Sequence, residues 1–440
     1  MQYTGARRPS VAIIGAGWAG LTCALHLARA GFNPVVYESA PEAGGRARRA
    51  KLDDVWRDNG QHLMLSGCTA LTQLLSRIGV TLPQVPFAYT DGQRALSLAD
   101  RCGRNGLLLA LLNAHGFSWR ERWALLHALL MLQLRGWQVA KTATVAQWLR
   151  AQRQPASLIE HFWTPLALAI LNTPLEVAAM SRLAPVLRDT LGAGGEALAI
   201  LQPSADLSAS VVEPLQQAIE RAGGILRCGQ RVTAVQPTDN ELTLAIQGKD
   251  TRQGFDRVVL AVPPWALAHI KLPFATTALA ERFGAQPIAT VYLGYDAHIR
   301  LPTPLAQIPG PTATDARVWA MDRSQSGQPH EQGVIAISLS AAGPWTKLDH
   351  ETLAACCATN LQHLLGRHVF CRWHKVVTAH RATPAATSDA YLRDEERQPY
   401  PGLWLAGDWT HAYYPATLEA AVQTGTAIAE KIMVGDSHSD

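Results

Sequence analysis

The sequence predicts an α/β protein in which a nucleotide-binding domain is assembled from segments far apart in the chain. A β-branched run, residues 11–14, leads directly into a glycine-rich turn and a helical segment. Near the other end, the apolar run 403–406 precedes a Gly-Asp turn and a second helical segment. Between them, runs such as "QPIATVYLGYD" and "GVIAISLSA" have the alternation or β-branching of sheet strands. The chain is therefore expected to leave and re-enter the nucleotide-binding domain.

Length and composition set the broad class. With 440 residues, of which 48% are hydrophobic and 17% charged, the chain is expected to fold into two or three globular domains. The formal charge of +4 is small and no block of Lys or Arg indicates nucleic-acid binding, although a weakly basic protein is attracted to anionic lipid. The seven cysteines contain no C-x-x-C pair, so neither a metal site nor a disulfide framework is indicated, and a reducing cytoplasm is expected.

The first thirty residues imitate a secretion signal. The stretch "ARRPSVAIIGAGWAGLTCALHLARA" has twin arginines, an apolar run and a small-residue end. We favour strand, turn and helix instead, because Gly15-x-Gly17-x-x-Gly20 follows the strand directly and residues 21–30 are helix formers. No window reaches the roughly 18 uninterrupted apolar residues of a membrane-spanning helix. The protein is expected in the cytoplasm, either free or peripheral on the inner membrane.

Each glycine of this turn has a physical role. Gly15 permits the tight turn, Gly17 lets the backbone approach a pyrophosphate, and Gly20 allows close packing of the helix on the strand. Free N–H groups at the helix start attract phosphate. A second strand, "PVVYES", ends in Glu38, about twenty residues further on, where a carboxylate accepts hydrogen bonds from both ribose hydroxyls. The motif alone is weak, but together with Glu38 it predicts NAD or the ADP part of FAD.

The residues after the second strand favour FAD. A nicotinamide-binding domain would continue with further βα units, whereas "APEAGGRARR" makes a turn in which Arg46 can pair with pyrophosphate. A solvated basic turn is the alternative. At the other end, Asp408 follows a buried strand and a helix opens near Thr417, which suits the ribityl chain and the pyrimidine edge of a flavin. A strand and helix capped by Asp408 is the alternative there.

Taken together, "VAIIGAGWAGLTCALHLARAGFNPVVYESAPEAGGRARR" and "GLWLAGDWTHAYYPATLEAAVQTG" resemble the flavin-containing amine oxidase and phytoene desaturase superfamily. Three further stretches, "DNGQHLML", "HFWTPLALAILNTPLEVAAMS" and "QPIATVYLGY", look like its squalene-associated branch, the hydroxysqualene dehydroxylases. The resemblance implies an amine oxidase-like fold, with a Rossmann-like FAD-binding domain and a discontinuous mixed-sheet and helical substrate domain. The expected boundaries are 1–90, 201–268 and 385–440 for the FAD-binding domain, and 91–200 and 269–384 for the substrate domain.

The resemblance also implies the residues that bind FAD. It assigns the pyrophosphate to Gly15, Gly17 and Gly20, the adenosine ribose to Glu38, the phosphate nearer the flavin to Gly45 and Arg46, the adenine to Val232, the ribityl chain or a phosphate to Asp408, and the pyrimidine edge to Thr417 and Leu418. One departure concerns the last motif. The usual Glu-Gly-Ala is Glu419-Ala420-Ala421 here, which crowds the helix start by one methyl group.

The polar run "RDNGQHLML" is expected to line the flavin. In this superfamily the segment after the Gly-Gly-Arg turn passes along the flavin ring, which implies that backbone at Gly60 approaches the ring and that Gln61 or His62 stands at the reaction face. An imidazole with a pKa of about 6.5 can protonate a leaving hydroxyl at neutral pH. His62 is alternatively a hydrogen-bonding residue behind the ring. Asp58 is expected to orient the loop.

A long apolar helix is predicted in the middle of the chain. Ser118 and Glu121 form a capping box ahead of "WRERWALLHALLMLQLRG", and Gly136 ends the helix. Apolar residues cover most of its circumference, which indicates a helix that is buried or in contact with lipid. Burial is favoured, but Trp119 and Trp123 also suit an anchor at a membrane surface.

The resemblance implies an FAD oxidoreductase that converts hydroxysqualene to squalene by reductive dehydroxylation. Its partners would be a long-chain isoprenoid substrate and an electron donor that the sequence does not identify. The protein would also contact a membrane peripherally. A carotenoid desaturase or an amine oxidase is the alternative, and Tyr413 with Tyr414 lies where an amine oxidase has aromatic residues. A prenyl-lipid carrier without catalysis is the other alternative, against which Glu38, Arg46 and Asp408 argue.

Overall fold

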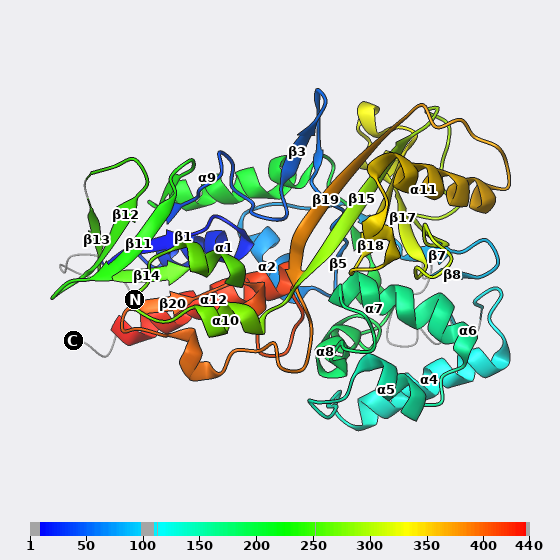
Figure 1. Ribbon diagram of the computed structural model, residues 1–440, viewed down its shortest axis with the longest axis horizontal. Coiled ribbons are helices and arrows are strands. Elements are labelled where there is room, and N and C mark those ends of the chain that lie inside the picture. The colour runs from blue at the N-terminus through cyan, green and yellow to red at the C-terminus, as the bar shows by residue number, and fades with distance from the viewer. Residues whose placement is uncertain (1–8, 98–109, 112, 251, 437–440) are drawn as a thin grey trace.

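The computed structural model describes residues 9–97, 110–111, 113–250 and 252–436, and it contains a five-stranded parallel sheet. The arginine pair of the signal-like stretch lies outside the described residues. The strand order is β10 (Ile225–Arg227), β2 (Asn33–Tyr37), β1 (Ser10–Ile14), β14 (Arg257–Leu260) and β20 (Leu403–Leu405). Strands from both ends of the chain thus meet in one Rossmann-like sheet, as the sequence predicts (Figure 1).

Both faces of this sheet are covered, because successive side chains of a strand point to opposite faces. Val11 and Ile13 pack against helices on one face, and Ala12 and Ile14 pack against a second, three-stranded sheet on the other. The helices are α1 (Trp18–Arg29), α2 (Thr69–Arg77), α9 (Glu213–Arg221) and α12 (Leu418–Asp436). The small sheet consists of β11 (Val232–Pro237), β12 (Leu242–Ile246) and β13 (Gln253–Phe255).

A seven-stranded mixed sheet forms the second part of the molecule (Figure 1). Its order is β19 (Trp373–Pro384), β15 (Ala285–Gly294), β18 (Val334–Ser340), β17 (Val318–Asp322), β16 (Leu305–Ile308), β7 (Ala88–Thr90) and β8 (Ala95–Ser97). The runs predicted as strands are β15 and β18, and they pair antiparallel. Among the described strands of this sheet, β7 and β16 pair parallel and the other neighbours pair antiparallel. Helix α11 (His350–Leu365) covers the face that carries Ala289 and Val291.

The segment that leads from the cofactor side to this sheet consists of short strands. The polar run starts in the second strand of the hairpin that β3 (Arg49–Leu52) forms with β4 (Val55–Asp58). It ends in β5 (Met64–Leu65), which pairs with β9 (Ile200–Leu201), and β9 also pairs with β6 (Gln84–Val85). Residues 59–63 of the polar run therefore lie between two fixed strands, β4 and β5.

Helices form the remaining part, at the lower right of Figure 1. They include α4 (Trp119–Leu134), α5 (Val145–Ala151), α6 (Ala156–Leu158), α7 (Thr164–Leu171) and α8 (Met180–Asp189). Both hydrogen bonds of the predicted capping box are present at the start of α4. The preference for a buried helix is wrong in part. One side of α4 packs inward, but Trp119 and Trp123 on the other side are exposed, because no described element covers them.

Candidate functional site

The predicted glycine turn joins β1 to α1, and the protein itself requires two of its glycines. Gly15 has a φ of +108°, and a Cβ there would lie 2.5 Å from the carbonyl oxygen of Ala261. A Cβ at Gly20 would lie 2.0 Å from the carbonyl oxygen of Gly15. At Gly17, by contrast, a Cβ would meet no atom of the described residues within 4 Å. The space over Gly17 therefore lies open to a phosphate at the start of α1.

A second glycine turn packs on the first. Gly44 and Gly45 have φ values of +105° and +61°, and the N–H of Gly44 donates to the carbonyl oxygen of Ala16 at 2.8 Å. A Cβ at Gly45 would lie 3.0 Å from the Cα of Gly17. The two turns therefore offer adjacent stretches of bare backbone, and Arg46 extends from the second of them.

Glu38 lies directly after β2, beside the first turn. One carboxylate oxygen accepts from the N–H of Ala16 at 2.9 Å, and the other accepts from the N–H of Ala40 at 2.8 Å. Val232 opens β11 and is buried. Gln230, two residues earlier, donates its N–H to the carbonyl oxygen of Glu38 at 2.8 Å. The structure thus brings the residues predicted for ribose and adenine into one neighbourhood.

Arg46 and Asp408 connect the two ends of the chain. Nη2 of Arg46 lies 2.7 Å and 2.6 Å from the two carboxylate oxygens of Asp408, and Nη1 donates to the carbonyl oxygen of Ala382 at 2.8 Å. Asp408 follows β20 and is buried. A guanidinium that is held in this way, next to two glycine turns, is oriented to meet a phosphate.

Thr417 and Leu418 stand at the start of α12, as predicted. Oγ1 of Thr417 accepts from the N–H of Ala420 at 3.2 Å, which caps the helix. Ala420 is fully buried, so its extra methyl group is accommodated. One turn further on, Oγ1 of Thr424 accepts from the N–H of Gly407 at 3.3 Å, which fixes the helix against the turn that carries Asp408.

Two unpartnered polar atoms, one from the polar run and one from β15, lie around Gly60. Nε2 of His62 and Oγ1 of Thr290 on β15 are both buried, and neither has a hydrogen-bond partner among the described residues. A Cβ at Gly60 would lie 3.8 Å from Oγ1 of Thr290 and 4.0 Å from Nε2 of His62. Since buried polar atoms are normally paired, these two indicate the place of a missing polar ligand.

The electrostatics of His62 differ from the sequence-based expectation. Burial, and then the positive charge of Arg46, lower the pKa of His62 from 6.5 to about 4. The imidazole is therefore neutral at pH 7, whereas the sequence predicted a pKa of about 6.5. Burial could not be read from the polar residues that surround His62 in the sequence.

The side chain of Gln61 is held in a single orientation by two partners, one on β15 and one directly after β17 of the seven-stranded sheet. Its Nε2 donates to the hydroxyl of Tyr292 at 2.9 Å, and its Oε1 accepts from Nη1 of Arg323 at 3.2 Å. The hydroxyl of Tyr292 in turn donates to the backbone carbonyl of Asp58 at 2.7 Å. Because Arg323 can only donate, a flipped side-chain amide of Gln61 would lose its contact with Arg323.

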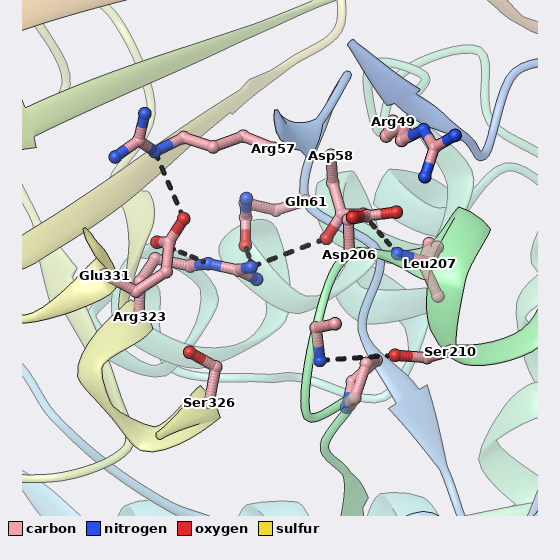
Figure 2. Close-up of polar contacts among 12 residues, drawn as sticks. Arg49, Arg57, Asp58, Gln61, Asp206, Leu207, Ser210, Arg323, Ser326 and Glu331 are labelled. Carbon is pink, nitrogen blue, oxygen red and sulfur yellow. Dashed lines mark hydrogen bonds and ion pairs between the residues drawn. The ribbon is translucent and has the colours of Figure 1, made fainter. Parts of the chain in front are cut away.

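A buried network of four charges lies behind Gln61 (Figure 2). Glu331 pairs with Nε of Arg57 at 3.1 Å and with Nε of Arg323 at 3.3 Å. Nη2 of Arg323 lies 3.6 Å from Oδ2 of Asp58, whose Oδ1 accepts the N–H of Leu207 at 2.7 Å. Burial raises the pKa of Asp58 to about 6, against the opposite effect of Arg323. Asp58 thus ties the polar run to the segment at Leu207.

Two cavities lie along the inner face of the seven-stranded sheet. The smaller, of about 30 Å³, is lined by Gln61, His62 and Arg323 among others, and has room for one water or hydroxyl group. The larger, of about 430 Å³, lies between β17 and β18 and the helices. Ser338 lines the larger cavity and pairs across the sheet with Thr290, so one sheet face connects the larger cavity to the polar run.

The aromatic cage considered for an amine oxidase is not formed by Tyr413 and Tyr414. The side chain of Tyr413 is 65% exposed. Tyr414 is buried, its ring packs on His411, and its hydroxyl bonds to the carboxylate of Asp189. The ring of Tyr413 is therefore part of the protein surface, and the ring of Tyr414 packs within this loop.

Several residues of the site escaped the sequence analysis. Arg323 and Glu331 lie far along the chain and belong to no recognised motif, so no signal pointed to them. Tyr292 lies within "QPIATVYLGY", one of the stretches that resemble the squalene-associated branch, but that resemblance assigned it no role. Glu419 was noted only as part of the last motif.

The arrangement fits the FAD that the sequence predicts. The open backbone at Gly17 and the oriented guanidinium of Arg46 suit the diphosphate, and the carboxylate of Glu38 suits the ribose. The unpartnered atoms of His62 and Thr290 suit the polar edge of a flavin ring.

Comparisons with known proteins agree with this geometry. The chain is 29% identical to the hydroxysqualene dehydroxylase of Rhodopseudomonas palustris over 435 residues, which cover 96% of this chain and 98% of that protein. It is 25% identical to the 15-cis-phytoene desaturase of Synechococcus elongatus over 467 residues, which cover 96% and 95%. Among solved structures, an oxidoreductase from Methanosarcina mazei has the same fold, with a TM-score of 0.73, 15% identity and coverage of 96% and 100%.

The family model for flavin containing amine oxidoreductase matches residues 18–433, which is nearly the whole chain. The description of that family names a flavin as its cofactor. The chain therefore belongs to the flavin containing amine oxidoreductase family, and it is an FAD-dependent oxidoreductase.

Proposed function

We propose that this enzyme removes the hydroxyl group of hydroxysqualene by reduction, which yields squalene. The observation that carries the proposal is the position of the polar run. Gln61 and His62 lie at one end of a sheet face whose other end lines a cavity of about 430 Å³. A long apolar molecule with a single hydroxyl group needs this combination. The near full-length similarity to hydroxysqualene dehydroxylases supports the choice of substrate.

The lining of the larger cavity supports an isoprenoid. Much of it is apolar, with contributions from α5, α7 and β17, and includes Leu149, Ile159, Leu168, Leu175, Val318 and Trp319. Such walls exclude water from a reacting allylic carbon, which would otherwise be captured as an alcohol. The smaller cavity next to Gln61 and His62 has the size of the water that would leave.

The reaction balances as one proton and one hydride consumed for each water released. The allylic C–O bond breaks while the oxygen takes up a proton, and a hydride then forms the new C–H bond. Reduced FAD, when bound at the assigned residues, would supply the hydride, and an external electron donor would have to reduce the flavin again.

We assign the binding of FAD to a set of residues that includes the two glycine turns and both ends of the chain. They are Gly15, Gly17, Gly20, Glu38, Gly45, Arg46, Gly60, Val232, Asp408, Thr417 and Leu418. Gly60 belongs to this set because a Cβ there would clash with no atom of the described residues, so the protein itself does not require glycine at this position. A bound flavin ring lying against Gly60 would require it.

For the reacting hydroxyl we assign Gln61 and His62. The amide of Gln61 has a fixed direction because Tyr292 and Arg323 hold both of its ends. Neutral His62 offers Nε2 as a hydrogen-bond partner, and it would carry a proton only when a nearby anionic group raises its pKa. Its role in proton transfer would therefore depend on the loaded site.

The decisive experiment uses the FAD-loaded protein, reduced without oxygen and mixed with hydroxysqualene. We expect squalene to form and the visible absorbance of oxidised flavin to return at the same rate. The His62→Gln variant should retain FAD but lose about a hundredfold or more in rate, the usual range for a group that assists proton transfer. Stable reduced flavin and unchanged hydroxysqualene would contradict the proposal.

The similarity to a phytoene desaturase supports one second candidate, the dehydrogenation of a carotenoid precursor. That reaction runs in the opposite direction, because the oxidised cofactor accepts hydride from the substrate. Oxidised enzyme with phytoene is the matching assay. Bleaching of the flavin with formation of a longer polyene, and no reaction with hydroxysqualene, would select this second function.

A further inference from the structure

Helix α4 carries an exposed apolar face. The side chains of Trp119, Trp123, Leu130 and Leu134 are 64%, 68%, 50% and 71% exposed. Their spacing of four, seven and four residues places them on one side of the helix. We call these four side chains the α4 face. Large apolar groups gathered on one surface mark an interaction site more often than chance exposure does.

The α4 face is presented by a fixed helix. The opposite side of α4 is buried through Leu125, Ala128, Leu129 and Leu132. The capping box of Ser118 and Glu121 holds the start of the helix. Two hydrogen bonds tie α4 to the segment after α5, one from Gln154 to the carbonyl of Ala124 at 2.9 Å and one from Ser157 to Glu121 at 2.7 Å. Rotation of the helix therefore cannot bury the exposed side.

The stretch of chain that contains α4 is basic. Residues 113–158 contain six arginine and lysine residues and a single acidic residue, Glu121, which is buried. Arg120 and Arg135 are exposed at the two ends of the helix, and the guanidinium of Arg122 lies 5.0 Å from the ring centre of Trp119. A positive charge of this density around exposed tryptophan and leucine is complementary to anionic headgroups above an acyl layer.

We propose that the α4 face docks on the surface of a bilayer that contains anionic lipids. Tryptophan and arginine suit the boundary between headgroups and acyl chains, and the two leucines would enter the acyl layer. No helix among the described residues is long and apolar enough to cross a membrane. This inference goes beyond the proposed reaction, since lipid binding requires no substrate.

The size of the α4 face disfavours a second copy of this chain as its occupant. A stable interface between two proteins uses about twenty residues from each side. The α4 face offers four large side chains on a single helix, and its margin carries like charges that would repel in a symmetric pair. A lipid surface requires neither twenty contact residues nor a partner face of opposite charge on a second copy.

The docked position would place the larger cavity near the bilayer. Leu149 and Arg150 of α5 line that cavity, and Arg150 is one of the six basic residues of this region. The segment that follows α5 holds α4 through Gln154. A lipid-soluble substrate could then enter from the membrane without crossing water.

The test is co-sedimentation of the full-length, FAD-loaded protein with vesicles. Vesicles of phosphatidylglycerol and phosphatidylethanolamine are compared with vesicles of phosphatidylcholine alone. We expect binding to the first and weak binding to the second. Trp123→Ser should weaken binding about tenfold, because one large apolar side chain no longer enters the interface. Arg120→Gln with Arg135→Gln should weaken it about tenfold on the anionic vesicles only.

The matched control is Phe370→Ser, which removes an aromatic side chain that is 74% exposed between α11 and β19. It should bind like the unaltered protein. An unchanged melting temperature and flavin absorbance establish that each variant is folded. Equal binding by Trp123→Ser and the unaltered protein would overturn the proposal. So would a dimer in lipid-free solution that Trp123→Ser dissociates, because the α4 face would then contact a second copy.

Discussion

The side chains of Arg46 and Asp408, 362 positions apart in the chain, form an ion pair in which Nη2 of the arginine contacts both carboxylate oxygens. Arg46 extends from the second glycine turn, and Asp408 follows the last strand of the parallel sheet. The pair therefore closes the candidate FAD site from two sides. It also neutralises a buried carboxylate, one oxygen of which accepts in addition from the N–H of Trp409 at 2.9 Å.

Replacement of Arg46 is expected to weaken FAD retention. Arg46→Ala removes a guanidinium that is directed at the expected diphosphate and leaves Asp408 unpaired, so we expect an affinity loss of about tenfold to a hundredfold. Titration of the flavin-free protein with FAD measures it. The control is Arg48→Ala, in the same segment, whose guanidinium donates to the carbonyl of Glu42. Equal retention by the two variants would show that Arg46 has no part in cofactor binding.

Glu419 is expected to stabilise the fold through the start of α2. Its carboxylate oxygens accept the N–H groups of Ala70 and Leu71, both at 2.9 Å, and the side chain is buried. Glu419→Ala leaves these two groups without an acceptor, so we expect a loss of about 2 kcal/mol in the free energy of unfolding. Glu430→Ala, an exposed site on the same helix, should change it by less than about 0.5 kcal/mol. Similar losses in both would contradict the capping role.

The sequence predicted those parts of the fold and the site that depend on local patterns. The sequence correctly predicted three local features: the strand, glycine turn and helix of residues 11–29, the position of Glu38 after β2, and the capping box of α4. Each of these features is decided by neighbours in the chain. The partners of Gln61 could not be predicted, because Tyr292 lies on the distant strand β15 and Arg323 follows the distant strand β17. The low pKa of His62 likewise depends on tertiary burial.

The sidedness of α4 shows the same limit. Its sequence is apolar around most of the circumference, so no periodicity indicated which side faces the core. The buried side is chosen by what packs against it, namely the segment of Gln154 and Ser157. Only the tertiary structure could therefore reveal that Trp119 and Trp123 lie outside.

Asp58 is expected to make stability depend on pH. Its pKa is raised from 3.8 to about 6 in the folded chain, so folding retains a proton that the unfolded chain has released. The contribution is fully present below pH 3.8 and is lost as the pH rises through about 6. Relative to Asp58→Asn, the native protein should lose up to about 3 kcal/mol in the free energy of unfolding between pH 4 and pH 7.

Denaturant unfolding across that pH range measures the difference. Asp54→Asn is the matched control in the same hairpin, because its side chain is 99% exposed and its difference from the native protein should vary little with pH. A difference for Asp58→Asn that does not change with pH would mean that Arg323 keeps the carboxylate ionised in the folded chain.

Tyr292 is expected to position Gln61 for the reaction. Its hydroxyl accepts from the amide of Gln61 at 2.9 Å and donates to the carbonyl of Asp58 at 2.7 Å. Tyr292→Phe leaves both groups buried without this partner, so we expect a loss of about 1–3 kcal/mol in the free energy of unfolding. With one of its two holding contacts gone, Gln61 should lose its fixed direction. We therefore expect kcat to fall about tenfold while KM changes little.

Tyr295→Phe separates this role from the general effect of a removed hydroxyl. Tyr295 lies three residues after Tyr292, directly after the end of β15, and its buried hydroxyl has no partner among the described residues. Removal of an unpaired buried hydroxyl should leave stability equal or slightly higher and kcat unchanged. If Tyr292→Phe lost stability but kept the native kcat, the contact with Gln61 would be structural only. If both variants lost kcat equally, Tyr292 would have no specific part in the orientation of Gln61.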